Sequence, residues 1–273
     1  MRGRWARARA IAFLVACCCC MQAQSPQITG IAHIALRVAD LERSRAFFRL
    51  LGFEEAFTLG DGGKAAEVFV KINDRQFIEL YPRTSEFETL GWMHVCYEAD
   101  SANGLHDLAG ERGLNPSPVV KGAAGNLLFS VKDTEGRLVE ITQYLPGSLH
   151  FNDRGKHLGN ERVADEMVGI RMPGAEAAME NFYAAGLGFK PRNGKRSRQM
   201  RLSGNAQEWI EISAAEAGLP VQFRLKTADA GAAASRLELR GLAVKRQRNA
   251  VVVDDPDGNV FVFAGGGSAL VLQ

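Results

Sequence analysis

Two histidines and two glutamates lie at matching positions inside short apolar segments of this 273-residue chain. His33 lies in IAHIAL and His94 in WMHVCY, while Glu79 lies in FIELY and Glu140 in LVEIT. The separation from His33 to Glu79 is 46 residues, and it is the same from His94 to Glu140. Two imidazoles and two carboxylates form a mixed nitrogen and oxygen set that suits one divalent ion of Zn, Ni, Co, Mn or Fe.

The alternative is that each residue serves packing alone. A single histidine on an apolar strand is more often a satisfied core residue than a metal ligand, and a single buried glutamate is more often a salt-bridge partner. A buried carboxylate is costly unless its charge is compensated, however, and here two of them occur at the same offset from a histidine. The matched spacing therefore favours a shared metal ion held by His33, Glu79, His94 and Glu140.

The elements that must position these residues occur in a repeated order. Period-two alternation places Ile31, His33, Ala35 and Arg37 on one face of a strand, and Asp40 is a suitable N-cap for the helix that follows. Glycine-rich turns then separate three further strands, and the order of strand, helix and three strands begins again. The predicted elements of the first copy are a strand over 31–37, a helix over 41–51 and strands over 54–59, 65–70 and 76–81. Those of the second copy are a strand over 92–98, a helix over 101–113 and strands over 118–120, 126–131 and 137–144.

The same order recurs twice more in weaker form. Two pairs of similar segments support the repeat: LGF occurs at both 51–53 and 187–189, and QFIEL at 76–80 resembles EWIEI at 208–212. Four units, each with its own strands, predict two paired domains. We therefore expect a domain over 28–145, a linker over 146–165 and a second domain over 166–265. His150 and His157 lie in the linker, where lone histidines are most often surface residues.

These segments resemble the vicinal oxygen chelate superfamily, which groups glyoxalase I, extradiol dioxygenases, and fosfomycin and bleomycin resistance proteins. The resemblance is carried by IAHIALRVADLERSRAFFRLLGF, FIELYP, WMHVCYEAD and KDTEGRLVEITQY. It implies an α+β fold in which tandem βαβββ modules form two cupped eight-stranded domains, with metal ligands on the first and last strands of each module. The second domain departs from the ligand pattern, since residues 167–172 hold no histidine, Phe223 and Val262 replace two ligands and only Glu211 remains. We expect that domain to be metal-free.

Three functions are compatible with this resemblance. The first, which the presence of Glu79 favours, is lyase or isomerase chemistry of the glyoxalase type on a small substrate chelated through vicinal oxygens, with Glu79 and Glu140 as catalytic groups. The second is an extradiol ring-cleaving dioxygenase that uses Fe(II) on a catechol-like diol with His33, His94 and Glu140 alone as ligands. The third is a small-molecule binding or antibiotic-resistance module. Tyr81 could donate a hydrogen bond to the substrate, and Arg37 could hold an anionic one.

The N-terminal segment resembles a secretory signal. Residues 1–23 carry four arginines, an apolar run and four of the five cysteines, and the run is too short to span a membrane. Cleavage near Ala23 predicts a periplasmic or secreted protein, whereas LVAC at 14–17 also resembles a lipobox, which would make Cys17 a lipid anchor. Loss of the segment changes the formal charge from +2 to −2, so the charge gives no support for nucleic-acid binding. A small molecule is the expected partner, and pairing as a homodimer is left open.

Overall fold

The computed structural model describes residues 25–61, 63–192, 198–214 and 220–265. The predicted signal over residues 1–23, with Cys17, lies outside the described residues. Within the described ranges, none of the helices has both the length and the apolar character needed to cross a bilayer.

The first two sequence units combine into one eight-stranded sheet. Its strand order is β2-β3-β4-β1-β5-β8-β7-β6, so the units meet where β1 pairs with β5 in antiparallel register. Each unit also pairs its first strand with its last in parallel, β1 with β4 and β5 with β8. The elements are β1 (Ile28–Val38), α1 (Leu41–Leu50), β2 (Glu54–Asp61), β3 (Lys64–Lys71), β4 (Phe77–Pro82), β5 (Gly91–Ala99), α2 (Ala102–Glu111), β6 (Val120–Lys121), β7 (Leu127–Lys132) and β8 (Leu138–Gln143).

The third and fourth units form a second sheet with the same topology. Its order is β10-β11-β12-β9-β13-β16-β15-β14, and β9 pairs with β13 as β1 pairs with β5. The elements are β9 (Glu166–Pro173), α4 (Glu176–Asn181), the π-helix η1 (Phe182–Gly186), β10 (Lys190–Arg192), β11 (Arg198–Arg201), β12 (Trp209–Ser213), β13 (Gln222–Thr227), α5 (Ala230–Leu239), β14 (Lys245–Gln247), β15 (Ala250–Asp254) and β16 (Val260–Gly265). Two sheets of mixed direction with few helices confirm the predicted α+β fold of paired βαβββ modules.

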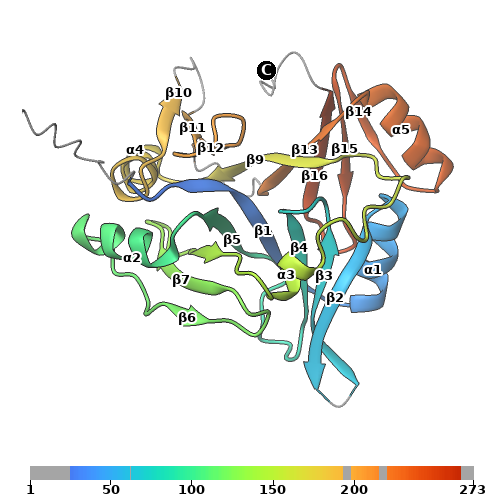
Figure 1. Cartoon of the computed structure of the whole chain (residues 1–273). Helices are drawn as coiled ribbons and strands as arrows, with labels where there is room; N and C mark the ends of the chain where they lie inside the picture. The colour runs from blue at the N-terminus through green and yellow to red at the C-terminus, as the bar shows by residue number, and fades with distance from the viewer. Residues whose placement is uncertain (1–24, 62, 193–197, 215–219, 266–273) are drawn as a thin grey trace, which may run out of the picture.

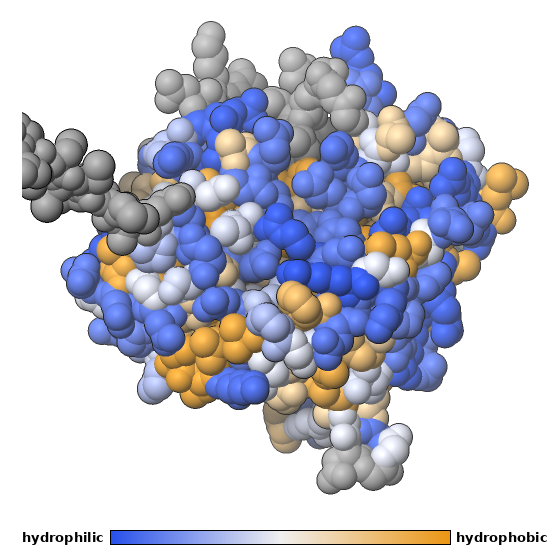
Figure 2. All heavy atoms as spheres, in the orientation of Figure 1, coloured by the Kyte–Doolittle hydropathy of each residue, from blue (hydrophilic) through white to orange (hydrophobic). Residues whose placement is uncertain are grey.

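One apolar core joins the two sheets. Helix α1 lies beside the second sheet in Figure 1, and its Phe48 ring lies 5.5 Å from that of Phe261 on β16. At the other end of the interface, Tyr97 on β5 packs edge to face against Phe189, with ring centroids 5.2 Å apart. On the outer surface, hydrophilic residues cover most of the face shown in Figure 2, and apolar residues form small separate groups. The helices of the first domain thus bury their apolar side between the sheets.

Irregular register in β1 decides which of its residues face away from this core. The pairing with β5 shifts between Ile31 and His33, so the predicted alternation does not hold across that point. Ile31 belongs to the main core together with Ile34, whereas Ala32 belongs to a small cluster with Phe77. The prediction that Ile31 shares the face of His33 is therefore wrong, because an irregularity in the strand changes the phase of its side chains.

Residues 146–165, predicted to be a linker, pack against the first domain. They contain the short helix α3 (Leu149–Asn152), whose N-cap Ser148 accepts a hydrogen bond from the Phe151 amide at 3.2 Å. The helix lies close to β3 and β4 in Figure 1. Its C-terminal end is fixed by Lys71, which is fully buried and lies 2.8 Å from Asp153 Oδ2.

Candidate metal centre

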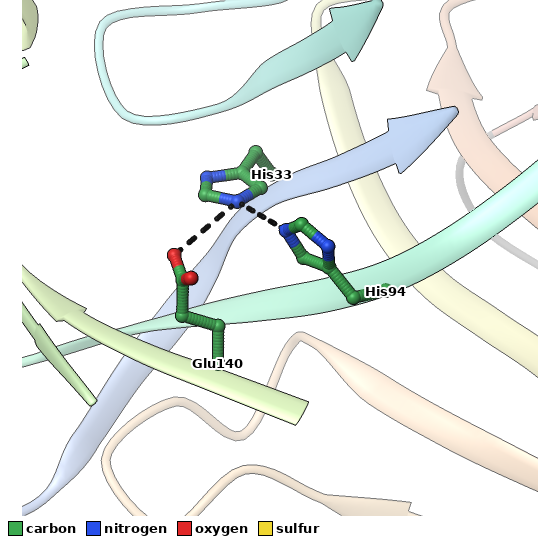
Figure 3. A group of neighbouring side chains, drawn as sticks. All are labelled: His33, His94 and Glu140. Atoms are coloured by element: carbon green, nitrogen blue, oxygen red, sulfur yellow. Dashed lines mark hydrogen bonds and ion pairs between the residues drawn. The ribbon is translucent and has the colours of Figure 1, made fainter. Parts of the chain in front are cut away.

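Three adjacent strands bring His33, His94 and Glu140 together on the face of the first sheet that points away from the main core (Figure 3). We call this face the cup. His33 on β1 is in register with Cys96 on β5, and Cys96 is in register with Glu140 on β8. His94 lies two residues before Cys96 and therefore on the same face of β5. The Nε2 atoms of the two histidines are 3.2 Å apart, and His33 Nε2 is 3.7 Å from Glu140 Oε1. One ligand atom from each residue thus lies within 4.8 Å of the other two.

The charges at this cluster suit a cation. Burial lowers the pKa of His33 well below its usual value, with a further contribution from His94, and burial lowers the pKa of His94 to about 4. Both imidazoles are therefore neutral at physiological pH, which is the form that binds metal. Burial also raises the pKa of Glu140 to about 7. Two neutral imidazoles and a carboxylate with no cationic side chain among them fit a divalent ion of the Fe, Mn, Co, Ni or Zn type.

Glu79 contacts the opposite side of the His33 ring. It lies on β4 in register with Ala35 of β1, and its Oε1 is 3.0 Å from His33 Nδ1. Histidines that bind metal through one nitrogen commonly have a carboxylate at the other, which fixes the ring and its tautomer. The structure therefore groups the ligand atoms of three of the four predicted ligands and places Glu79 behind His33. Direct coordination by Glu79 stays a prediction.

Glu79 also belongs to a network of acidic groups. Its Oε2 accepts a hydrogen bond from the Tyr81 hydroxyl at 3.2 Å, and the same hydroxyl lies 2.6 Å from Glu67 Oε1. Burial raises the pKa of Glu79 well above its usual value, and the charges of Glu67 and Glu140 raise it further. The pKa of Glu67 is raised as well, chiefly by burial. Two neighbouring carboxyl groups with raised pKa values can hold one proton between them.

A cavity of about 220 Å³ opens beside the three ligands. Tyr81 lines it, as predicted for a residue that could contact substrate, and so do Glu67 and Glu79. Arg37 is not among the lining residues, and its guanidinium lies 3.4 Å from Glu88 Oε1 near the surface. The lining residues are His33, Leu59, Glu67, Phe69, Glu79, Tyr81, Gly122, Ala123, Ala124, Asn126, Leu128, Glu140, Thr142 and His150.

The polar residues His150 and Asn126 also line this cavity, and neither is among the predicted site residues. His150 is only 3% exposed, so the expectation of a surface residue is wrong, because α3 packs onto the cup. Asn126 Nδ2 lies 2.8 Å from His150 Nδ1. Two features of the sequence could have indicated a packed helix here: Ser148 is a suitable N-cap, and the neighbours of His150 are the apolar residues Leu149 and Phe151.

The second sheet has different residues at the positions that correspond to the ligands. By strand register, Gly169 corresponds to His33, Gln222 to His94 and Val262 to Glu140. The assignment of Phe223 to the second position is therefore wrong by one residue, and Phe223 belongs to the core. A Cβ at Gly169 would come within 2.6 Å of Trp209, so the indole fills the space that His33 occupies in the first sheet.

Comparison with known proteins shows the fold. No protein-family model and no curated protein sequence matches the chain. Among solved structures, the Mn(II)-bound glyoxalase from Novosphingobium aromaticivorans is 17% identical, with a TM-score of 0.68 over 88% of this chain and 83% of that one. A catechol 2,3-dioxygenase is 13% identical, with a TM-score of 0.69 over 90% of this chain and 91% of that one. The 2,3-dioxygenase LapB from Pseudomonas sp. KL28 is 16% identical, with a TM-score of 0.65 over 88% and 94%. The chain shares the two-domain fold of these glyoxalase and dioxygenase structures, which is the fold that the sequence resemblance implied.

Proposed function

We propose that this protein is a divalent-metal-dependent enzyme that binds a small substrate through two vicinal oxygens. One observation carries the proposal: ligand atoms of His33, His94 and Glu140, from three adjacent strands, lie within 4.8 Å of one another beside a cavity. The glyoxalase and dioxygenases of the same fold support it, since one of those structures is Mn(II)-bound.

The reaction that fits this geometry best is extradiol ring cleavage of a catechol-like diol. Two histidines and one carboxylate leave an octahedral ion three positions, enough for both oxygens of a diol and for O₂, and Fe(II) there would supply the oxygen chemistry. Glu79 supports this choice because its carboxylate is held at His33 Nδ1, away from the Nε2 atom that faces the other two ligands.

The remaining residues of the cavity would handle the substrate's protons. A catechol must lose protons from its hydroxyl groups as it is chelated. Glu67 and Glu79 both line the cavity and both have raised pKa values, so either carboxylate can accept one of these protons when it is ionised. Tyr81 links Glu79 to Glu67 through its hydroxyl, which gives the proton a second carboxylate to reach.

A second candidate is lyase or isomerase chemistry of the glyoxalase type. The same raised pKa and cavity position of Glu79 favour it, because this reaction needs a base that moves a proton between adjacent carbons. In that case Glu79 would be essential to turnover rather than a group that orients His33.

Oxygen consumption separates the candidates. Protein loaded with Fe(II) under anaerobic conditions is mixed with a panel of catechols in an oxygen electrode, and ring-cleaved product is followed by absorbance. The dioxygenase proposal predicts one O₂ consumed per catechol, with no consumption by Glu140→Ala. Conversion of hemithioacetals without O₂ would instead support the lyase candidate. Substrate recovered intact from a saturable complex would support a binding module.

We also propose that the chain is exported. The basic start and apolar run of residues 1–23 support this, and the mass of the mature protein tests it. A chain that begins after Ala23 in the periplasmic or secreted fraction is expected, whereas a lipidated N-terminus at Cys17 would indicate a membrane anchor. An uncleaved chain in the cytoplasm would contradict export. Homodimer formation is checked by the mass of the same sample in solution.

A further inference from the structure

The buried imidazole of His150 enters the metal cup from outside the two βαβββ modules. It lies on α3, beyond the last strand of the first sheet, and it lines the cavity together with His33, Glu79 and Glu140. Neither the metal ligands nor the acidic network includes it. The chain therefore adds a polar side chain to the cavity from a segment that the module pattern does not supply.

Aromatic side chains fix the orientation of this ring. Tyr144 stacks on it with ring centroids 4.7 Å apart and an angle of 12° between the planes. Phe57, Phe69 and Phe77 meet it edge to face at 5.0, 5.1 and 4.7 Å. Because rings on several sides restrict both side-chain torsions, the two ring nitrogens have set positions.

Asn126 determines which of these nitrogens carries the proton. Its amide nitrogen lies 2.8 Å from Nδ1, and an amide nitrogen can only donate, so Nδ1 accepts. The proton of the neutral imidazole is then on Nε2. Among the residues that the structure describes, no hydrogen-bond partner is found for Nε2, although the atom is buried. A buried donor without a partner is costly, and a ligand oxygen in the cavity would satisfy it.

The imidazole is also neutral at physiological pH. Burial lowers the pKa of His150 to about 3, and the charge of Lys71 lowers it as well, although Asp153 acts in the opposite direction. A neutral histidine with a fixed tautomer can donate a hydrogen bond to a developing oxyanion without transferring a full proton to it.

We propose that His150 is a substrate-binding residue whose Nε2–H donates a hydrogen bond to an anionic oxygen of the chelated substrate. This inference rests on the proposed function, since it takes the ligand to be a vicinal dioxygen compound in the cup. It adds a specificity for ligands that carry negative charge on the oxygen facing α3, such as a deprotonated catechol.

The position of α3 is built into the first domain. Lys71 donates to the backbone carbonyl of Asp153 at 2.6 Å and to its carboxylate at 2.8 Å, at the end of the helix. At the start of the helix, the Leu149 amide donates to Ala124 O at 2.9 Å, and Ala124 itself lines the cavity. His150 is therefore held at both ends of a four-residue helix rather than on a free loop.

The test uses protein loaded with Zn(II), which does not react with O₂, and 4-nitrocatechol, whose visible spectrum reports ionisation on binding. His150→Phe keeps the aromatic packing and removes the donor, so affinity should fall by about 10- to 100-fold, the range for a hydrogen bond to a charged group. Zinc content should not change. His106→Asn is the matched control, because His106 is a partly exposed histidine that pairs with Asp107 and does not line the cavity.

The tautomer gives a second measurement that requires no variant to fold. Nitrogen-15 correlation spectra of the histidine side chains should show His150 neutral with its proton on Nε2, and 4-nitrocatechol should shift that resonance. In Asn126→Asp the new carboxylate can only accept a hydrogen bond from His150. This variant should therefore move the His150 proton from Nε2 to Nδ1 and weaken 4-nitrocatechol binding. Equal affinity of wild type and His150→Phe, or a proton found on Nδ1 in the wild type, would overturn the role of His150 and leave the proposed function standing. A wild type that binds metal but no 4-nitrocatechol would overturn both.

Discussion

Glu79 Oε1 lies 3.0 Å from Nδ1 of His33, while Nε2 of the same ring faces His94 and Glu140. In this arrangement Glu79 orients a metal ligand. Glu79→Gln should therefore lower metal affinity by about 10- to 100-fold, the usual cost of losing a carboxylate behind a ligating histidine. At saturating Fe(II) the variant should keep much of its ring-cleavage rate, measured with the oxygen electrode.

The contrary result is equally informative. Loss of nearly all turnover in Glu79→Gln with full metal occupancy would show that Glu79 is a proton-transfer group, as the lyase candidate requires. Glu88→Gln is a suitable control, because Glu88 is also an acidic residue of the first domain but pairs with Arg37 outside the cavity.

Metal binding should stabilise the fold. Titration of Mn(II) into the metal-free protein should raise its melting temperature, with about 2.7 kcal/mol of added stability when the free ion reaches about 100 times Kd. His94→Ala removes one of three ligands and should abolish the shift. His106→Ala should keep it, since His106 pairs with Asp107 on the surface rather than with the ligand cluster. An equal shift in His94→Ala and wild type would place the ion elsewhere.

The segment that carries His150 depends on a buried ion pair. Lys71 is fully buried and Asp153 is 6% exposed, so Lys71→Ala removes the cation from a buried carboxylate, which keeps its side-chain contact with His157. Such a loss costs about 3–5 kcal/mol of unfolding free energy, measurable by urea denaturation. Lys245→Ala breaks an exposed pair with Asp254 and should cost less than about 1 kcal/mol. Similar costs for the two variants would show that the buried pair does not anchor α3.

Acid should destabilise the metal-free protein through its buried histidines. The folded-state pKa values of His150, about 3, and His94, about 4, lie below the unfolded value of 6.5. The unfolded chain therefore binds more protons at these two sites between these limits, and their contribution to the unfolding free energy falls as pH falls from about 6.5 towards 4. His150→Phe should remove about 1.4 kcal/mol per pH unit of that slope.

Buried glutamates change the unfolding free energy with pH in the opposite direction to the histidines. The effect of His150 is therefore measured as the difference between wild type and His150→Phe. Burial raises the pKa of Glu140 and of Glu208 to about 7, so both favour the folded state as pH falls below 7. Unfolding free energies of wild type and His150→Phe at pH 7, 6 and 5 give the difference directly. Parallel pH profiles for the two proteins would contradict the neutral, buried state of His150.

The paired-module fold could be predicted because its signals are local. Glycine turns, period-two strands and the equal spacing of His33–Glu79 and His94–Glu140 mark each unit, and the sheet order confirms that units pair as first with second and third with fourth. The same repeat predicted the three residues of the metal cluster, His33 on β1, His94 on β5 and Glu140 on β8. These signals lie within single strands and turns, where side-chain alternation and turn residues can be read directly from the sequence.

Features that depend on irregular strands or distant contacts could not be predicted in this way. The pairing of β13 with β9 shifts register between Arg224 and Leu225. By the pairing of the strands, the residue that corresponds to His94 is Gln222 rather than Phe223. His150 lies in a segment without periodicity, and its burial depends on the contacts of Lys71 and Asn126 with that segment. The position of Glu79 relative to His33 depends on the orientation of the imidazole ring, which a strand pattern does not specify.

The proposed function requires that His33, His94 and Glu140 hold one divalent ion. Anomalous scattering from crystals soaked in Mn(II) would locate that ion. We expect a single strong peak in the cup, about 2.0–2.2 Å from Nε2 of each histidine and from a Glu140 carboxylate oxygen, by analogy with first-row metal sites. A cup without a peak, or a peak bound by other residues, would contradict it.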